Sequence, residues 1–232
     1  MENKIIVALD FDSSSRAVDF VDNLDPESCR LKIGKELFTA AGPHLVEALI
    51  KKNFDVFLDL KFHDIPNTVR SAVKVAAELG VWMLNLHISG GSAMMKSAMD
   101  AIHSLEGRKP IVIGVTVLTS ISSVELSEIG IGSDLKEQVV KLARLAYQSG
   151  LDGVVCSAEE AKLLRNSMPA DFILVTPGIR REQDAVGDQK RVITPSQAIR
   201  NGSDYLVVGR PITHATSPSA ALAAFYSEIA SV

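Results

Sequence analysis

Short runs of apolar and β-branched residues alternate with amphipathic segments along the whole chain. Most of these runs show no alternation of apolar and polar positions, which is typical of parallel strands buried on both faces. The runs predict eight strands, at Lys4–Leu9, Cys29–Ile33, Asp55–Leu60, Trp82–His87, Pro110–Val115, Gly153–Cys156, Phe172–Val175 and Tyr205–Val208.

The segments between the predicted strands carry apolar residues at helical spacing, and several begin at a serine or a proline that suits a helix start. Gly80, Gly150 and Gly202 follow such segments, at the place where a helix end requires a left-handed residue. The expected helices are Ser14–Leu24, Pro43–Lys52, Asn67–Leu79, Ala93–Leu105, Lys136–Gln148, Ala158–Asn166, Pro195–Arg200 and Pro218–Ile229.

Eight β-then-α units in a chain of 232 residues predict an α/β fold, a closed (β/α)8 TIM barrel that forms a single domain over residues 1–232. An open doubly wound sheet is the alternative. It usually has fewer strands, and its first turn often carries the motif G-x-G-x-x-G, which this chain lacks. A barrel would bring the carboxyl ends of all strands to one mouth, where active sites of this fold lie.

Composition and charge exclude several classes of protein. Apolar residues make up 47% of the chain and the net charge is −4, without the basic stripe expected of a nucleic-acid binder. No apolar run reaches the roughly 18 residues that cross a bilayer, and the start of the chain does not resemble a secretory signal. We therefore expect a cytoplasmic protein that binds neither nucleic acid nor a membrane.

The two cysteines, Cys29 and Cys156, lie beside or inside predicted strands. Buried free thiols are therefore expected rather than a structural disulfide. No Cys/His cluster has the spacing of a zinc site, so no metal site is predicted.

The stretch Val56–Thr68 places Asp59, Lys61 and Asp64 within six positions after an apolar run. Charges this crowded lose hydration free energy unless opposite signs meet. In a barrel, Lys32 of the preceding strand would lie beside Asp59, which produces an alternating Lys–Asp–Lys–Asp array. A fixed ammonium in a dry pocket can stabilise developing negative charge and then donate a proton to it. The alternative is an ordinary strand end with surface ion pairs.

The chain after the last predicted strand carries the pattern of an anion site. Gly209 would let the backbone approach an anion, and Arg210 at the start of a short helix would add charge, where barrels commonly bind phosphate. The polar segment Thr176–Arg191 follows strand seven and is interpreted as a lid, from which Arg180 and Gln189 would reach the phosphate. The alternatives are a loop glycine with a surface arginine, and a structureless surface loop.

Further polar residues stand at predicted strand ends and would converge on the same mouth, namely Asp10, His87, Thr119 and Ser120. His63 is interpreted as a structural, hydrogen-bonded histidine. His87 is interpreted in the same way, with a minor role in the pocket left open.

The chain contains six motifs that resemble, in the same order, those of the orotidine 5'-phosphate decarboxylase family. The resemblance covers essentially the whole chain, and the run D-x-K-x-x-D-I-P-x-T is specific. Related sugar-phosphate enzymes share D-x-K-x-x-D, but they typically place a glycine where this chain has Pro66, and they use magnesium. The motifs are A-L-D-F-D at Ala8–Asp12, L-K-I-G at Leu31–Gly34, D-L-K-F-H-D-I-P-N-T at Asp59–Thr68, V-T-V-L-T-S at Val115–Ser120, T-P-G-I-R at Thr176–Arg180 and V-V-G-R-P-I-T at Val207–Thr213.

The resemblance implies decarboxylation of orotidine 5'-monophosphate to UMP and CO2, the last step of de novo pyrimidine synthesis, without a metal or an organic cofactor. It implies that Lys61 donates a proton to C6 of the pyrimidine and is flanked by Asp59 and Lys32. It also implies a homodimer with shared active sites, in which Asp64 and Thr68 serve the neighbouring subunit.

The resemblance further implies which residues contact each part of the substrate. The ribose hydroxyls would contact Asp10 and Lys32, and the pyrimidine would lie near Thr119 and Ser120. The phosphate would be contacted or surrounded by Arg180, Gln189, Gly209 and Arg210.

Two other functions stay open at this point. One is a magnesium-dependent sugar-phosphate decarboxylase or aldolase of the same superfamily. The other is a barrel that binds a phosphorylated ligand without turning it over, against which the intact alternation of lysine and aspartate argues.

Overall fold

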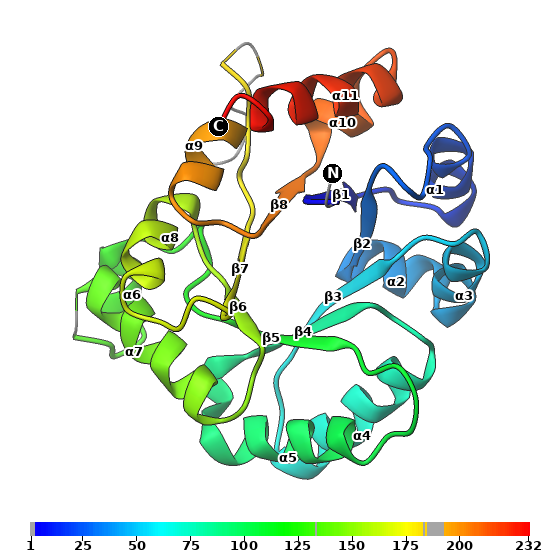
Figure 1. The fold of residues 1–232 in the computed structure, drawn as a ribbon. Coiled ribbons are helices and arrows are strands. Elements are labelled where there is room, and N and C mark those ends of the chain that lie inside the picture. Colours follow the sequence, from blue (N-terminus) through cyan, green and yellow to red (C-terminus); the bar gives the residue numbers. More distant parts are fainter. Residues whose placement is uncertain (1–2, 133, 183, 185–192) are drawn as a thin grey trace.

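Eight parallel strands close into a barrel in the computed structural model, which describes residues 3–132, 134–182, 184 and 193–232 (Figure 1). Each strand pairs with the next one along the chain, and β8 pairs with β1. The predicted TIM barrel is therefore confirmed. The strands are β1 Ile5–Leu9, β2 Arg30–Gly34, β3 Val56–Phe62, β4 Met83–His87, β5 Ile111–Val115, β6 Gly153–Val155, β7 Ile173–Thr176 and β8 Tyr205–Val208.

All eight predicted strands are present, and no end differs from its predicted position by more than two residues. The difference at β3 has a structural cause. This strand continues to Phe62, two residues beyond the expected end, because its pairing with β4 shifts register between Leu58 and Phe62. The residues inside the shifted segment include Asp59 and Lys61.

Helices form an outer ring around the barrel (Figure 1). Gly80, Gly150 and Gly202 have φ values of 86°, 86° and 95°, so the predicted left-handed helix ends are confirmed. The helices are α1 Ser14–Val21, α2 Lys35–Ala41, α3 Pro43–Lys51, α4 Pro66–Glu78, α5 Gly91–His103, α6 Ser123–Glu128, α7 Leu135–Gln148, α8 Ala158–Arg165, α9 Pro195–Arg200, α10 Arg210–Thr213 and α11 Pro218–Ile229, with the 3₁₀ helix η1 at Ile88–Gly90.

Three of these helices were not expected from the sequence: α2, α6 and η1. Each has seven residues or fewer, which is too short for a repeated helical pattern to stand out. The start of α6 nevertheless has a local signal, because Ser122 and Glu125 form a reciprocal capping box. α1 ends at Val21, three residues before the predicted end at Leu24.

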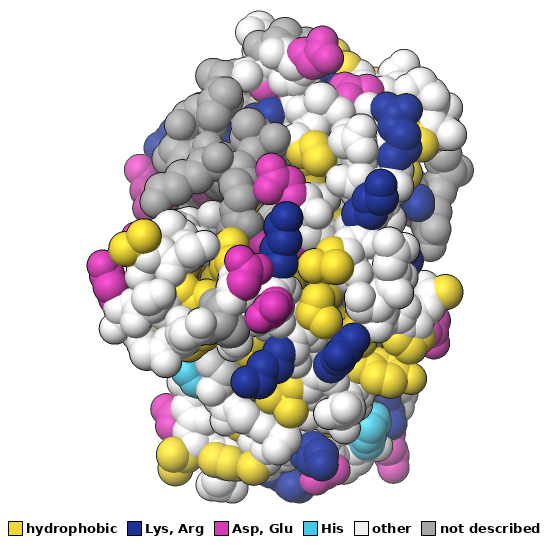
Figure 2. All heavy atoms as spheres, turned by 90° about the vertical axis from the view of Figure 1, so that its left-hand side faces the viewer, with side chains coloured by type: hydrophobic (Ala, Val, Ile, Leu, Met, Phe, Trp, Pro, Cys, Tyr) yellow, Lys and Arg dark blue, Asp and Glu magenta, His cyan; other side chains and the backbone are white. Residues whose placement is uncertain are grey.

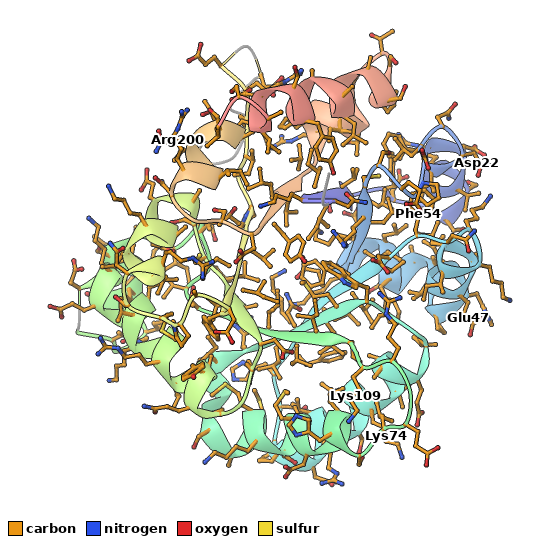
Figure 3. All side chains as sticks on the ribbon, in the orientation of Figure 1. Asp22, Glu47, Phe54, Lys74, Lys109 and Arg200 are labelled. Carbon is orange, nitrogen blue, oxygen red and sulfur yellow. The ribbon has the colours of Figure 1, made fainter. Side chains whose placement is uncertain are left out.

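Alternate residues along the strands divide the core into two parts. Ile5, Val7 and Leu9 of β1 face the surrounding helices, whereas Ile6 and Ala8 point into the barrel. Figure 3 shows that side chains fill the centre of the ring, so the barrel is a packed core rather than a pore. The interior cluster consists of Ile6, Ala8, Phe57, Trp82, Met83, Ile113, Val175 and Val207.

The amino ends of the strands are closed by an arginine. The guanidinium of Arg30 lies 4.3 Å from the ring centroid of Trp82 and 5.1 Å from that of Tyr205, and it pairs with Asp55. Cation–π contacts and an ion pair therefore stabilise the bottom of the barrel. The opposite end carries the polar side chains described below.

Cys29 and Cys156 are buried free thiols, as predicted. Burial raises the pKa of the Cys29 thiol to about 12, so it stays protonated at neutral pH. In the described part of the chain, no helix is long and apolar enough to cross a membrane.

Candidate active site

A cavity of about 180 Å³ lies at the carboxyl ends of the strands. Lys32, Asp59 and Lys61 form a charged wall, and Thr119 also lines the cavity. The rest of the lining is apolar, so charged groups here are poorly solvated. The apolar lining residues are Phe57, Val115, Val117, Leu118, Val155, Val175, Pro177 and Val207.

Larger hollows lie on the outer surface of the helical ring. One groove of about 630 Å³ includes Leu135 of α7 and Leu163 of α8, and Thr119 stands at its edge. This side of the molecule faces the viewer in Figure 2, where basic and acidic side chains are intermingled with small apolar patches. The groove lacks the strand-end lysines and Asp59, so the smaller cavity is the candidate active site.

Strand register brings the charged residues of the small cavity together. Ala8 of β1 pairs with Lys32 of β2, and Gly34 of β2 pairs with Asp59 of β3. The Asp59 carboxylate accepts a hydrogen bond from Lys61 Nζ at 2.6 Å and pairs with Lys32 Nζ at 3.3 Å. These are the contacts that the alternation of charges in the sequence predicted.

The alternating array of this chain continues at Asp10 rather than at Asp64. Lys32 Nζ lies 3.3 Å from Asp10 Oδ1, so the order in space is Asp10–Lys32–Asp59–Lys61. Asp64 lies beyond the end of β3 and is exposed, and its Oδ1 accepts a hydrogen bond from the backbone N–H of Ile65 at 2.6 Å. The structure therefore does not bring Asp64 into the array within one chain.

Asp59 is the electrostatic centre of the site. Its burial, with an exposed fraction of 8%, raises its pKa, but the charges of Lys32 and Lys61 and hydrogen bonds from Lys61 and Asn85 lower it more. The net pKa of Asp59 is below its ordinary value, so this carboxylate is ionised at neutral pH. An ionised carboxylate fixes two ammonium groups on one side of the cavity.

The sequence analysis missed Asn85, a fully buried residue of β4. Its Nδ2 donates to Asp59 Oδ1 at 2.7 Å, and its Oδ1 accepts from the backbone N–H of Lys61 at 2.8 Å. A signal was present, because Asn85 interrupts the apolar strand M-L-N-L-H. Buried amides are found where they are hydrogen-bonded, so a polar residue inside such a run indicates a partner.

Two glycines make room for this charged array. A Cβ on Gly34 would lie 3.2 Å from Lys32 Nζ, and a Cβ on Gly209 would lie 3.6 Å from Asp10 Oδ2. The backbone at the end of β8 therefore comes close to Asp10. This approach brings the predicted anion site at Gly209 and Arg210 next to the lysine–aspartate array.

Arg180 is buried just after β7, and its Nη1 donates to the carbonyl oxygen of Ile179 at 2.7 Å. Its backbone N–H also donates to the carbonyl oxygen of Ile193, two residues after the end of the segment predicted as a lid. Arg210 is exposed at the start of α10. Gln189 and most of the second half of the predicted lid lie outside the described residues.

The start of the same segment is attached to the helical ring by Arg181. The guanidinium pairs with Asp184 at 2.8 Å and lies 4.9 Å from the ring centroid of Phe225 in α11. The hydrogen bond with Asp184 and its charge raise the pKa of Arg181. The contacts of Arg181 therefore attach the segment next to Arg180 to α11.

The remaining predicted residues lie around the cavity rather than in it. Ser120 is exposed next to Thr119, and Thr68 is exposed on the first turn of α4. The rings of His63 and His87 are 5.4 Å apart, and neither residue lines the cavity. Burial, together with the charges of His63, Lys35 and Lys61, lowers the pKa of His87 to about 4, so this imidazole is neutral at pH 7.

Comparison with known proteins finds a matching family and several similar proteins. Residues 3–225 match the model of a family described as the orotidine 5'-phosphate decarboxylase / HUMPS family. A protein of Vibrio atlanticus (strain LGP32) named orotidine 5'-phosphate decarboxylase is 56% identical over 222 residues, which cover 96% of each chain. One of the same name from Glaesserella parasuis serovar 5 (strain SH0165) is 55% identical over 99% of this chain and 100% of its own.

A similar fold is found in a crystal structure of orotidine 5'-phosphate decarboxylase from Lactobacillus acidophilus. The TM-score is 0.89 and the sequence identity is 39%, over 98% of this chain and 99% of the other. The similarity therefore extends over nearly the whole length of both chains.

The space beside Gly34 generates a testable prediction. The φ of Gly34 is −89°, which alanine adopts readily, so Gly34→Ala would ordinarily stabilise the fold by about 0.4–1 kcal/mol. Because the new Cβ would crowd Lys32 Nζ, we expect a folded variant in which this ammonium moves away from Asp59. A crystal structure of the variant measures the displacement.

Gly132→Ala is the matched control, because a Cβ there meets no atom within 4 Å. It should leave the separation of Lys32 and Asp59 at its present value. If Lys32 Nζ also keeps its contact with Asp59 in Gly34→Ala, the glycine is not needed to accommodate the lysine.

Proposed function

The chain belongs to the orotidine 5'-phosphate decarboxylase / HUMPS family, and we propose that it decarboxylates orotidine 5'-monophosphate to UMP and CO2, the last step of de novo pyrimidine synthesis. The observation that carries this proposal is the pair of ammonium groups, Lys32 and Lys61, held by the buried carboxylate of Asp59 at the cavity. We propose that the reaction uses neither a metal nor an organic cofactor and takes place in the cytoplasm.

The reaction needs a positive charge at one atom of the substrate. When the bond between C6 and the carboxylate breaks, CO2 leaves and the electron pair stays on C6. That pair lies in the plane of the pyrimidine and cannot spread into its π system, so a nearby fixed charge must stabilise it. The Lys61 ammonium would stabilise the C6 carbanion and then donate a proton to it, and solvent would return the proton to Lys61.

Asp59 would have two roles in this scheme. Its carboxylate keeps the Lys61 ammonium in place through the contact at 2.6 Å. It would also lie beside the carboxylate that leaves as CO2. Two like charges in a poorly solvated cavity raise the free energy of the bound substrate, and this repulsion is relieved when CO2 departs.

The rest of the substrate would extend over the cavity mouth. Asp10 and Lys32, which are 3.3 Å apart, would bind the ribose hydroxyls. Thr119, which lines the cavity, and the adjacent Ser120 would lie near the pyrimidine. These assignments are supported by the positions of the residues in the chain, because Asp10 directly follows β1, Lys32 lies in β2, and Thr119 and Ser120 lie in the segment after β5.

The phosphate would bind between the segments that follow β7 and β8. Arg180, Gly209 and Arg210 lie on these two segments, and Gln189 is assigned to the same group from the family resemblance alone. The phosphate lies far from C6. Its binding would therefore contribute by orienting the substrate and by excluding water from the cavity. In this way the binding free energy of the phosphate would increase the rate of the reaction at C6.

We further propose a homodimer in which each subunit contributes to the other's cavity. Asp64 and Thr68 are exposed at the start of α4, and Ile65 between them is 67% exposed. This exposure leaves the side chains of Asp64 and Thr68 accessible to a second subunit. In a two-fold dimer, Asp64 would complete the partner's alternating array of lysine and aspartate.

A magnesium-dependent sugar-phosphate enzyme is the alternative that the sequence left open, and the description of the matching family names a second group beside the decarboxylases. Incubation of the purified protein with orotidine 5'-monophosphate in excess EDTA separates the candidates. We expect the ultraviolet absorbance of the substrate to fall as it is consumed. No loss of absorbance would contradict the proposed function, and activity that requires added magnesium would favour the second candidate.

The role of Lys61 is tested by Lys61→Ala. We expect turnover to be abolished, because no other ammonium would be in place to stabilise and protonate C6, while nucleotide binding stays measurable. Steady-state kinetics and calorimetry with UMP measure the two properties. Lys74→Ala, which removes an exposed lysine of α4, is the control and should retain activity. Near-normal turnover of Lys61→Ala would refute the proton-donor role.

The phosphate site is tested by Arg210→Ala. Loss of a charge-assisted pair should weaken UMP binding by ~2–4 kcal/mol. Arg108→Ala, which removes an exposed arginine paired with Asp55 at the other end of the barrel, should leave UMP binding unchanged. Equal UMP affinities for Arg210→Ala and the native protein would show that the phosphate binds elsewhere.

Shared active sites are tested by mixing two inactive variants, Lys61→Ala and Asp64→Asn. Each mixed dimer would contain one site with both native residues and one site with neither. Random mixing makes half of the dimers mixed, so about one quarter of the native activity should be restored. The mixture is assayed after subunit exchange. A mixture that stays as inactive as its components would contradict a cavity built from two subunits.

A further inference from the structure

Asn85 links the two residues on which the proposed chemistry depends. It lies in β4, with no exposed surface, and its amide contacts Asp59 and Lys61 of the neighbouring β3. It does not line the cavity. Any effect of Asn85 on the reaction must therefore pass through Asp59 and Lys61.

The pairing of β3 with β4 explains why a side chain is needed at this position. Leu58 pairs with Leu84 and Phe62 pairs with Leu86, so four steps along β3 match two steps along β4. Asn85 is thus the single residue of β4 opposite Asp59, Leu60 and Lys61. In such an irregular segment, backbone groups lose their regular partners.

Lys61 occupies the most unusual backbone conformation of this segment. Its φ is 52°, in the left-handed region that residues other than glycine rarely adopt. Its backbone N–H donates to Asn85 Oδ1 at 2.8 Å. The side-chain oxygen of Asn85 thereby takes the place of the backbone carbonyl that a regular β4 would offer, and it stabilises the left-handed conformation of Lys61. This conformation sets the direction in which the lysine side chain leaves the strand.

The other end of the same amide orients the Asp59 carboxylate. Oδ1 of Asp59 accepts from Asn85 Nδ2 at 2.7 Å and from Lys61 Nζ at 2.6 Å, while its Oδ2 faces Lys32. Asparagine suits this position because its side chain is both a donor and an acceptor. A carboxylate of the same shape would set an acceptor against Asp59, and an aliphatic side chain would offer neither group.

We propose that Asn85 is a positioning residue, which holds the left-handed backbone of Lys61 with its oxygen and the Asp59 carboxylate with its nitrogen, and thereby aims the Lys61 ammonium at the reacting carbon. This inference rests on the proposed decarboxylase function. It assigns to Asn85 an effect on the chemical step. Asn85 should have little effect on binding of the ribose and the phosphate, because the residues proposed to bind these groups belong to other strands or follow them.

Two nearly isosteric variants test the inference. Asn85→Leu removes both hydrogen bonds, and a displacement of the ammonium should lower kcat by about 100-fold. The dissociation constant for UMP should stay within about threefold of the native value, because remote parts of the nucleotide supply most of the binding. Steady-state kinetics and calorimetry with UMP give the two values.

Asn85→Asp separates a positioning role from a purely structural one. A residue that only stabilised the fold would not make kcat of this variant depend on pH in a new way. The second oxygen of the new carboxylate would lie against Asp59, and two carboxylates in contact share a proton as the pH falls. The shared proton restores the lost hydrogen bond. The ratio of variant to native kcat should therefore rise from neutral to acidic pH. Four charged or titratable groups lie around this pair. They are Lys32 of β2, Asp10, which follows β1 and pairs with Lys32, Lys61 of β3 and His87 of β4.

Thr116→Val is the matched control. Thr116 is buried just after β5, and its Oγ1 donates to the carbonyl oxygen of Val155 at 2.8 Å, away from the lysine–aspartate array. This variant loses one buried hydrogen bond at the same end of the barrel. Its kcat should stay within about threefold of the native value, since it does not touch the array.

The inference is overturned if folded Asn85 variants bind UMP and retain native kcat, or if Thr116→Val loses as much kcat as Asn85→Leu. If Asn85→Leu does not fold, Asn85→Asp decides the question, and a kcat ratio that does not change with pH counts against the inference. A native protein that does not consume orotidine 5'-monophosphate in the same assay would instead contradict the proposed function.

Discussion

The buried carboxylate of Asp59 is the group on which the site depends. A carboxylate with only 8% of its surface exposed is stable as an anion only if nearby groups replace the water that it has lost. Lys32, Lys61 and Asn85 supply those interactions from three adjacent strands. The same contacts fix two ammonium groups in a cavity whose remaining walls are mostly apolar, where a fixed charge acts strongly on a reacting atom.

The barrel makes this arrangement available because it aligns the ends of parallel strands. Residues that are distant in the sequence meet at neighbouring strand ends, as Asp10, Lys32 and Asp59 do. The opposite end is closed by Arg30 and its aromatic neighbours. The apolar interior between the two ends supports the charged side chains, since Lys32 pairs in register with Ala8 and Phe57 of the interior cluster.

Local patterns were sufficient to predict the strands, the barrel and the meeting of Lys32, Asp59 and Lys61. Each of these features follows from apolar runs, strand order and alternating charge, all of which can be read from neighbouring residues. The register shift in β3, the left-handed conformation of Lys61 and the contacts of Asn85 could not be predicted. They arise from the pairing of β3 with β4, and no pattern within either strand specifies that register. Asp64, which the sequence placed next in the alternating array, lies outside it in this chain and is exposed.

The central claim is that the Lys61 ammonium, held by Asp59, faces the carbon that loses CO2. A crystal structure of the protein with bound UMP tests it most directly. The account predicts Lys61 Nζ within about 3–3.5 Å of C6 of the pyrimidine, with its contact to Asp59 retained. A structure in which this nitrogen points into bulk solvent, with another group facing C6, would contradict the account.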